Sequence, residues 1–190
     1  MSKRPRVGII IEKGAEDILR RQRGRFVNSF IPDTQNTRPF RDALSQFGTG
    51  ITVVTVNTPN GPMGITANSF ASVSLDPPLV LWSPSNASRR AAFFIEAEHY
   101  AIHILGKDQA HISHAFAKVP HSFGALSYKE SEHGVPLIDG CLATFECRHH
   151  AAHEGGDHTI IVGEVERVTT GEGEPLLFHA GSFGTFHADL

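Results

Sequence analysis

Cysteine is scarce in this chain, and long apolar runs are missing. The two cysteines, Cys141 and Cys147, lie on one predicted strand, where cysteines rarely bridge each other, so a disulfide scaffold is not expected. No stretch approaches the ~20 apolar residues of a membrane helix. The apolar segment 7–11 is too short for the core of a secretory signal. We therefore expect a cytoplasmic protein with reduced thiols and no membrane span.

The sequence also lacks the motifs of several large enzyme classes. No Ser-His-Asp or paired-carboxylate constellation stands out, and the Rossmann fingerprint G-x-G-x-x-G is absent. A dinucleotide would therefore have to be held without a Rossmann unit. The hydrophobic share of 40 % and the charged share of 19 % are typical of a globular chain. A length of 190 residues suits one domain with an extension.

Positive charge is concentrated at the N-terminal end. Residues 1–32 hold eight of the 17 Lys and Arg but only three acidic residues. We predict a helix over 15–23 and a polar linker ending at Pro39. The sequence thus predicts a basic extension over 1–36 and a domain over 37–190. The extension has no interleaved aromatic residues and no nucleic-acid motif, so we expect disorder or contact with the acidic body of a dimer rather than nucleic-acid binding.

Periodicity predicts a few helices among many short strands. One helix begins at Pro39, with Phe40, Ala43, Leu44 and Phe47 on one face. A second spans 89–98, and a third spans 110–118 after an Asp108 N-cap. The segment 119–140 is too rich in Gly, Pro and Ser to be regular and is expected to be a long loop.

The strands are predicted between turn signals. The β-branched run 51–56 is apolar on both faces and should be a central strand. Asn60-Gly61 should close a hairpin, and Asp76-Pro77-Pro78 should precede a buried strand. Further strands are expected at 100–105, 141–149, 158–168 and 176–178. This pattern is typical of a mainly β (α+β) fold, a small barrel with peripheral helices.

Small polar side chains follow two of these strands and suggest a mononucleotide site. Thr66, Asn68 and Ser69 offer hydroxyl and amide groups suited to a heteroaromatic ring. One strand later, hydroxyls, an amide and a guanidinium at an expected helix start suit a phosphate monoester; they belong to Ser83, Ser85, Asn86, Ser88 and Arg89. The residues alone are equally consistent with Ser85 and Ser88 as helix caps and Asn68 as a turn residue.

Twelve histidines raise the question of a zinc site. His111 and His114 are three residues apart, and His149, His150 and His153 form a second group. The second group crosses a predicted strand end and loop, and no nearby cysteine completes a known spacing. We therefore expect solvated histidines and no metal.

Three segments together resemble the flavin reductase family. They are FRDALSQFGTGITVVTV (40–56), GITANSFASVSLDPPLVLWS (64–83) and GGDHTIIVGEVERV (155–168), and the resemblance extends from about Arg38 to Phe186. Their order and spacing are hard to reach by chance. The resemblance implies an FMN-binding split β-barrel and an NAD(P)H:flavin oxidoreductase, in which hydride passes from reduced nicotinamide to FMN or FAD.

The resemblance also implies roles for particular residues. Asp157 and His158 would lie on the nicotinamide side of the flavin, although the residues alone favour a turn with an exposed imidazole. The implied cofactor-binding residues are Thr66, Ala67, Asn68, Ser69, Ser83, Pro84, Ser85, Asn86, Ser88, Arg89 and Phe183. A homodimer and a separate monooxygenase that receives reduced flavin are the implied partners.

Two positions depart from the family pattern. Residues 180–183 stand where relatives often carry a basic residue, so a contact to flavin or dinucleotide phosphate is in doubt. His103 replaces an expected asparagine, and either substitutes for its amide hydrogen bonds or faces solvent. Two other functions stay open: a split-barrel flavoenzyme that keeps its FMN and reduces another acceptor, and a non-catalytic FMN-binding protein.

Overall fold

The computed structural model describes residues 29–35 and 37–188, and residues 1–41 and 42–190 separate into two units. In the first unit, the described residues 29–35 are irregular with a turn at Thr34 and Gln35. Most of the basic extension, including the helix predicted over 15–23, lies outside the described residues. The domain boundary after residue 36 stays a prediction.

Helix α2 (Thr37–Leu44) begins two residues before the predicted start and buries none of its residues. Its apolar face is open: Phe40 is 43 % and Leu44 57 % exposed, and Phe47, beyond the helix end, is 77 % exposed. The predicted apolar face therefore exists, and its large side chains are exposed.

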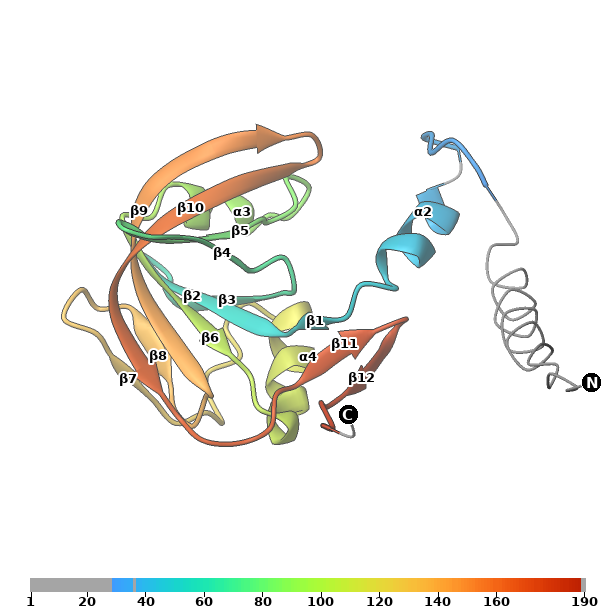
Figure 1. The fold of residues 1–190 in the computed structure, drawn as a ribbon. Helices are drawn as coiled ribbons and strands as arrows, with labels where there is room; N and C mark the ends of the chain where they lie inside the picture. The colour runs from blue at the N-terminus through green and yellow to red at the C-terminus, as the bar shows by residue number, and fades with distance from the viewer. Residues whose placement is uncertain (1–28, 36, 189–190) are drawn as a thin grey trace, which may run out of the picture. The chain divides into compact units, whose positions relative to one another are not determined.

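Seven antiparallel strands form the main sheet of the second unit (Figure 1). In chain order they are β2 (Thr52–Thr58), β3 (Gly61–Ala67), β4 (Ala71–Leu75), β5 (Pro78–Trp82), β6 (His99–Ile104), β9 (Ala143–Gly155) and β10 (His158–Thr170). Their order in space is β3-β2-β6-β9-β10-β5-β4. The two edge strands, β3 and β4, are consecutive in the chain but are not paired. A sheet whose edges are joined by only residues 68–70 must curve back on itself, which gives the predicted barrel with a split.

Strand β2 is central, as predicted, and is buried on both faces. Val54 and Val56 pack inside the barrel in a cluster that includes Trp82. Val53 faces the opposite way, into a second cluster with Phe116 of α4 (Ala110–Lys118). Residues that alternate between two apolar clusters explain why the run 51–56 has no polar side.

Smaller elements complete the domain. A three-stranded sheet joins β1 (Thr49–Gly50), β11 (Leu177–His179) and β12 (Ser182–Gly184) in the order β1-β11-β12. The others are α3 (Ala91–Ile95), the 3-10 turn η1 (Lys107–Gln109), β7 (Tyr128–Glu130) and β8 (Pro136–Ile138). No helix of the described chain is long and apolar enough to cross a membrane.

Three sequence expectations were wrong in detail. Helix α3 covers only 91–95 of the predicted 89–98, because the chain must extend to start β6 and Glu98 O already accepts the His149 N–H. Asp108 lies inside η1, and Gln109 is the N-cap of α4. The loop 119–140 contains the β7–β8 hairpin, whose second strand is fully buried and accepts a hydrogen bond from Thr55 Oγ1 at Pro136 O (2.6 Å).

Candidate functional site

The ends of β3 and β5, which carry most of the predicted ring and phosphate residues, are held side by side. Ser69 Oγ accepts the Ser83 N–H (2.9 Å) and donates to Ser83 O (3.2 Å). Because the Ser69 hydroxyl both donates and accepts, it links the two strand ends in place of a backbone hydrogen-bond pair. The two halves of the predicted mononucleotide motif are therefore neighbours in space.

A second junction joins the segment after β5 to the turn before β10. Asn86 N donates to Asp157 O (2.9 Å), and Asn86 Nδ2 donates to Gly156 O (3.2 Å). Thr159 Oγ1 donates to Asn86 Oδ1 (2.7 Å), and Ser85 forms an isolated bridge with His158. We call residues 83–86 and 156–159 the loop junction. Both groups of the Asn86 amide are engaged there, so this side chain positions the loops.

A hollow of about 240 Å3 lies beside α4. It is lined by Ile51, Thr66, Ala67, Asn68, Ser113, His114, Ala117, Phe178 and Phe183. Thr66 Oγ1 donates to Ser113 O (2.6 Å), which ties β3 to α4. The Phe183 ring packs edge-on against His114, with centroids 5.0 Å apart. This α4 hollow unites four of the predicted cofactor residues from the two ends of the domain, whereas Asp157 and His158 are not among its lining residues.

Two adjacent arginines have different environments. Arg89 is exposed and forms no hydrogen bond or ion pair with the described part of the chain. Arg90 Nη1 donates to Phe116 O (2.6 Å) and to Gly64 O (3.0 Å), and its Nη2 donates to Ala117 O (3.2 Å). Burial lowers the pKa of Arg90. Arg90 thus caps the carbonyl end of α4, and Arg89 alone is available to an anion.

The phosphate residues do not sit at a helix start. Helix α3 has five residues and begins after Arg90, which carries no side-chain cap. Ser88 Oγ accepts the Arg90 N–H (3.3 Å) within the preceding turn. The argument from helix-end amides is therefore wrong. An anion site would instead be formed by the loop itself, where neither Ala87 nor Arg89 forms a hydrogen bond with the rest of the described chain.

His158 lies at the edge of the loop junction with a fixed orientation. Its Nδ1 is 2.7 Å from Asp157 Oδ1, and 43 % of the His158 side chain is exposed. A carboxylate only accepts hydrogen bonds, so the Nδ1–H donates, and in the neutral imidazole Nε2 is left as an acceptor directed away from this partner. The imidazole is thus pre-oriented without being enclosed.

His103, which replaces an expected asparagine, substitutes for its amide. The side chain is fully buried. Its Nδ1 donates to Val53 O (3.0 Å), and its Nε2 accepts the Ile138 N–H (3.0 Å). Burial lowers the pKa of His103 to about 4, which keeps the ring neutral and allows it to accept. The solvent-facing alternative is excluded.

Similar proteins and solved structures point to one activity. The chain is 55 % identical over 157 residues to an FMN reductase (NADH), SmoA, of Agrobacterium fabrum, covering 83 % of this chain and 90 % of that protein. It is 38 % identical to the flavin-dependent monooxygenase reductase subunit HsaB of Mycobacterium tuberculosis, covering 77 % of this chain and 80 % of that protein. A Streptomyces globisporus NADH:FAD oxidoreductase, solved with NAD and FAD fragments, superposes with a TM-score of 0.78 at 36 % identity, covering 85 % of this chain and 99 % of that one.

The family assignment follows from the extent of the match. Residues 44–187 match the flavin reductase like domain, which is most of the unit that contains the barrel, the α4 hollow and the loop junction. The predictions of a flavin reductase and of a split-barrel fold are both confirmed. The chain therefore belongs to the flavin reductase-like domain family.

Proposed function

We propose that this protein is an NADH-dependent FMN reductase that holds the flavin along the ends of β3 and β5. The observation that carries the proposal is the hydrogen-bonded convergence of three segments, at Ser69–Ser83 and Asn86–Asp157. These segments are far apart in the chain but present one continuous set of polar groups. When bound, the flavin accepts a hydride from the reduced nicotinamide. The protein supplies binding and alignment.

The residues present fit a flavin phosphate. The Arg89 guanidinium has no hydrogen-bond or ion-pair partner among the described residues, and Ser85 and Ser88 lie in the same turn. A guanidinium with nearby hydroxyl and amide donors is well suited to a phosphate monoester. Arg90 is less suited to this role, because three of its five N–H donors are already engaged by backbone carbonyls. We assign the phosphate to the turn 85–89.

The α4 hollow fits the flat edge of a heteroaromatic ring. Thr66, Ala67 and Asn68 form one wall, and the Phe183 ring forms another. Its volume of about 240 Å3 is below the ~300–1,000 Å3 of typical enclosed small-molecule sites. One chain therefore offers only part of an enclosure, which supports a homodimer in which a second copy covers the ring.

His158 and Asp157 are assigned to the nicotinamide. The Asp157 carboxylate fixes the imidazole tautomer at 2.7 Å, and the exposed Nε2 can accept a hydrogen bond, for which the nicotinamide carboxamide is a suitable donor. Such a contact would align the two rings without taking part in proton transfer. Both residues thus act in binding and orientation.

We propose that the reduced flavin passes to a separate monooxygenase. HsaB and similar chains are reductase subunits of flavin-dependent monooxygenases, and we extend this role to the present protein. We place it in the cytoplasm, where NADH is available and where its two buried, unbridged cysteines would stay reduced.

An anaerobic assay tests the proposed activity. The protein is mixed with FMN and NADH, and the flavin absorbance is followed against a mixture without protein. Excess free FMN is then added. A reductase bleaches many equivalents of flavin, a flavoenzyme with another acceptor bleaches one bound equivalent, and a binding protein bleaches none faster than the control. Either of the last two results would overturn the proposal.

A further inference from the structure

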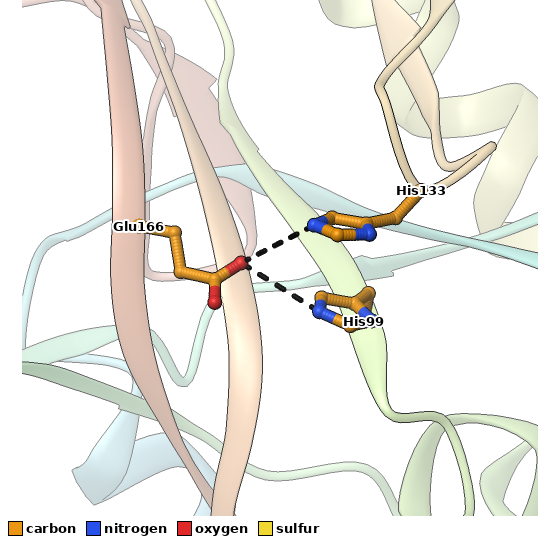
Figure 2. A group of neighbouring side chains, drawn as sticks. All are labelled: His99, His133 and Glu166. Carbon is orange, nitrogen blue, oxygen red and sulfur yellow. Dashed lines mark ion pairs between the residues drawn. The ribbon is translucent and has the colours of Figure 1, made fainter.

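Outside the α4 hollow and the loop junction, two histidines and a glutamate face one another (Figure 2). His99 Nε2 is 3.7 Å and His133 Nε2 is 3.8 Å from the same atom, Glu166 Oε2. The two imidazole rings stack with centroids 3.8 Å apart and an angle of 13° between their planes. Both nitrogen–oxygen distances exceed those of a hydrogen bond. The three ligand-type atoms therefore lie close together without hydrogen bonds between them.

The fold brings these residues together from three distant segments. His99 opens β6, and His133 lies in the turn between β7 and β8. Glu166 is the extra residue of a β-bulge in β10, since Val165 pairs with Cys147 and Arg167 pairs with Glu146. A bulge redirects a side chain that regular pairing would place elsewhere. Here Glu166 points toward the two imidazoles (Figure 2).

The turn that carries His133 is held by its own hydrogen bonds. Ser131 Oγ accepts the N–H groups of His133 and Val135, both at 3.1 Å. Ser131 N donates to Val135 O (2.9 Å), and Gly134 N donates to Ser131 O (3.0 Å) with Gly134 at φ +72°. A turn closed by four hydrogen bonds presents its histidine in a defined place. The backbone position of His133 is therefore fixed by the turn.

Glu166 is held on its other carboxylate oxygen by the guanidinium of Arg148. Arg148 Nε lies 3.4 Å from Glu166 Oε1, and Arg148 Nη2 donates to Glu164 Oε2 (2.7 Å). This leaves Oε2 for the imidazoles. Hydrogen-bonded partners that hold a ligating carboxylate are a regular feature of metal sites. Glu146, whose side chain is only 14 % exposed, lines the same small cavity, but its Oε1 lies 3.5 Å from Arg167 Nε, so this carboxylate already has a partner.

We propose that His99, His133 and Glu166 bind a zinc ion that pins the β7–β8 turn to the barrel, with water completing the coordination. Two imidazoles and a carboxylate are a ligand set that zinc takes with a fourth position open, whereas magnesium and calcium prefer oxygen ligands alone. The three ligand atoms all lie within 4.8 Å of one another. A tetrahedral zinc site needs ~3.3 Å between ligand atoms. A zinc ion also lies in the plane of each imidazole that binds it, so one of the two stacked rings must turn out of the stack when zinc binds.

Titration calorimetry with zinc chloride tests the site. The full chain, without a histidine tag and freed of metal by EDTA and dialysis, should bind one zinc per chain with a Kd in the micromolar range or below. His133→Ala and Glu166→Gln should each weaken binding by about 100-fold or more. His153→Ala is the matched control, because it removes an exposed histidine of the other histidine group, and its zinc affinity should be unchanged. Magnesium chloride should give no binding.

Thermal unfolding gives a second readout that is independent of flavin chemistry. Saturating zinc should raise the Tm of the wild-type protein, since a ligand of the folded state stabilises it by mass action. The same zinc concentration should leave the Tm of Glu166→Gln unchanged. Glu166→Gln keeps the side-chain volume and serves if His133→Ala fails to fold. Absence of zinc binding up to millimolar concentration would overturn the proposal and leave an imidazole–carboxylate ion pair. Loss of binding in His153→Ala but not in Glu166→Gln would overturn it in favour of the other histidine group.

Discussion

Arg89 and Arg90 are neighbours of the same residue type, yet they have different environments, and we expect different effects when each is replaced. Arg89→Ala should weaken FMN binding by about 1.5–3 kcal/mol, the range for a lost charge-assisted hydrogen bond. The Tm should change little, because Arg89 is exposed and forms no hydrogen bond or ion pair with the described residues. A fluorescence titration of FMN with the folded variant measures the loss. Unchanged affinity would remove Arg89 from the phosphate site.

Arg90→Ala is the contrasting variant. It leaves three carbonyls at the end of α4 and in β3 without their donor, so it should lower the free energy of unfolding by roughly 1–3 kcal/mol. FMN affinity at a temperature where the variant is folded should fall much less than in Arg89→Ala. The reverse pattern would exchange the roles of the two residues.

His158 is expected to act on orientation rather than on affinity for flavin. His158→Ala should keep FMN binding but slow flavin reduction by NADH about 10- to 100-fold, because alignment of the rings supplies much of the acceleration. Rapid mixing at saturating and subsaturating NADH measures the rate. His153→Ala, at the far side of the β9–β10 turn, is a control expected to keep the wild-type rate. An unchanged rate in His158→Ala would make His158 an ordinary turn histidine.

His103 makes stability depend on pH in a definite window. Its pKa falls from about 6.5 in the unfolded chain to about 4 when folded, so the unfolded chain binds the extra proton between these values. The stabilisation is complete above pH 6.5 and is lost as the pH falls toward 4, by about 3 kcal/mol. Urea unfolding of wild type and His103→Asn at several pH values measures it. The difference between the two proteins should narrow toward pH 4, and parallel curves would contradict this origin.

Strand β10 shows how one element depends on a missing side chain. A Cβ at Gly163 would lie 2.2 Å from Tyr100 Oη and 3.1 Å from Cys147 Cβ. Gly163→Ala should therefore destabilise the fold by roughly 1–3 kcal/mol through overpacking, measured by urea unfolding. Gly124→Ala, where nothing lies within 4 Å, is the control and should be close to neutral. Part of the loss should return in Gly163→Ala combined with Tyr100→Phe.

Among the helices and strands, the sequence predicted those elements that depend on interactions between neighbouring residues. The run 51–56 and the turn before Gly61 were sufficient to place β2 and its hairpin, because β-branched burial and turn chemistry act over a few residues. The β7–β8 hairpin and the end of α3 were mispredicted. Both depend on partners that are distant in the sequence. Thr55 Oγ1 donates a hydrogen bond to Pro136 O of β8, and the His149 N–H donates to Glu98 O, directly before β6.

At the scale of the whole molecule, we expect a homodimer. Edge strand β4 exposes Leu75 (96 %) and Val73 (47 %), and the α4 hollow is only partly enclosed. Light scattering at micromolar concentration should give about twice the chain mass of 20.7 kDa. Leu75→Lys should shift the protein toward a single-chain mass if β4 is part of the interface. A single-chain mass for the wild-type protein would rule out the dimer.

The sequence by itself determined the family and the barrel, because motifs, turns and alternating apolar residues are local properties of the chain. Only the tertiary structure decided which side chains are free to act. It committed Asn86 to the loop junction and Arg90 to the end of α4, and it left Arg89 available. It also gathered His99, His133 and Glu166, which no spacing in the sequence connects. Such outcomes depend on strand register and a β-bulge, which are set by packing across the whole sheet.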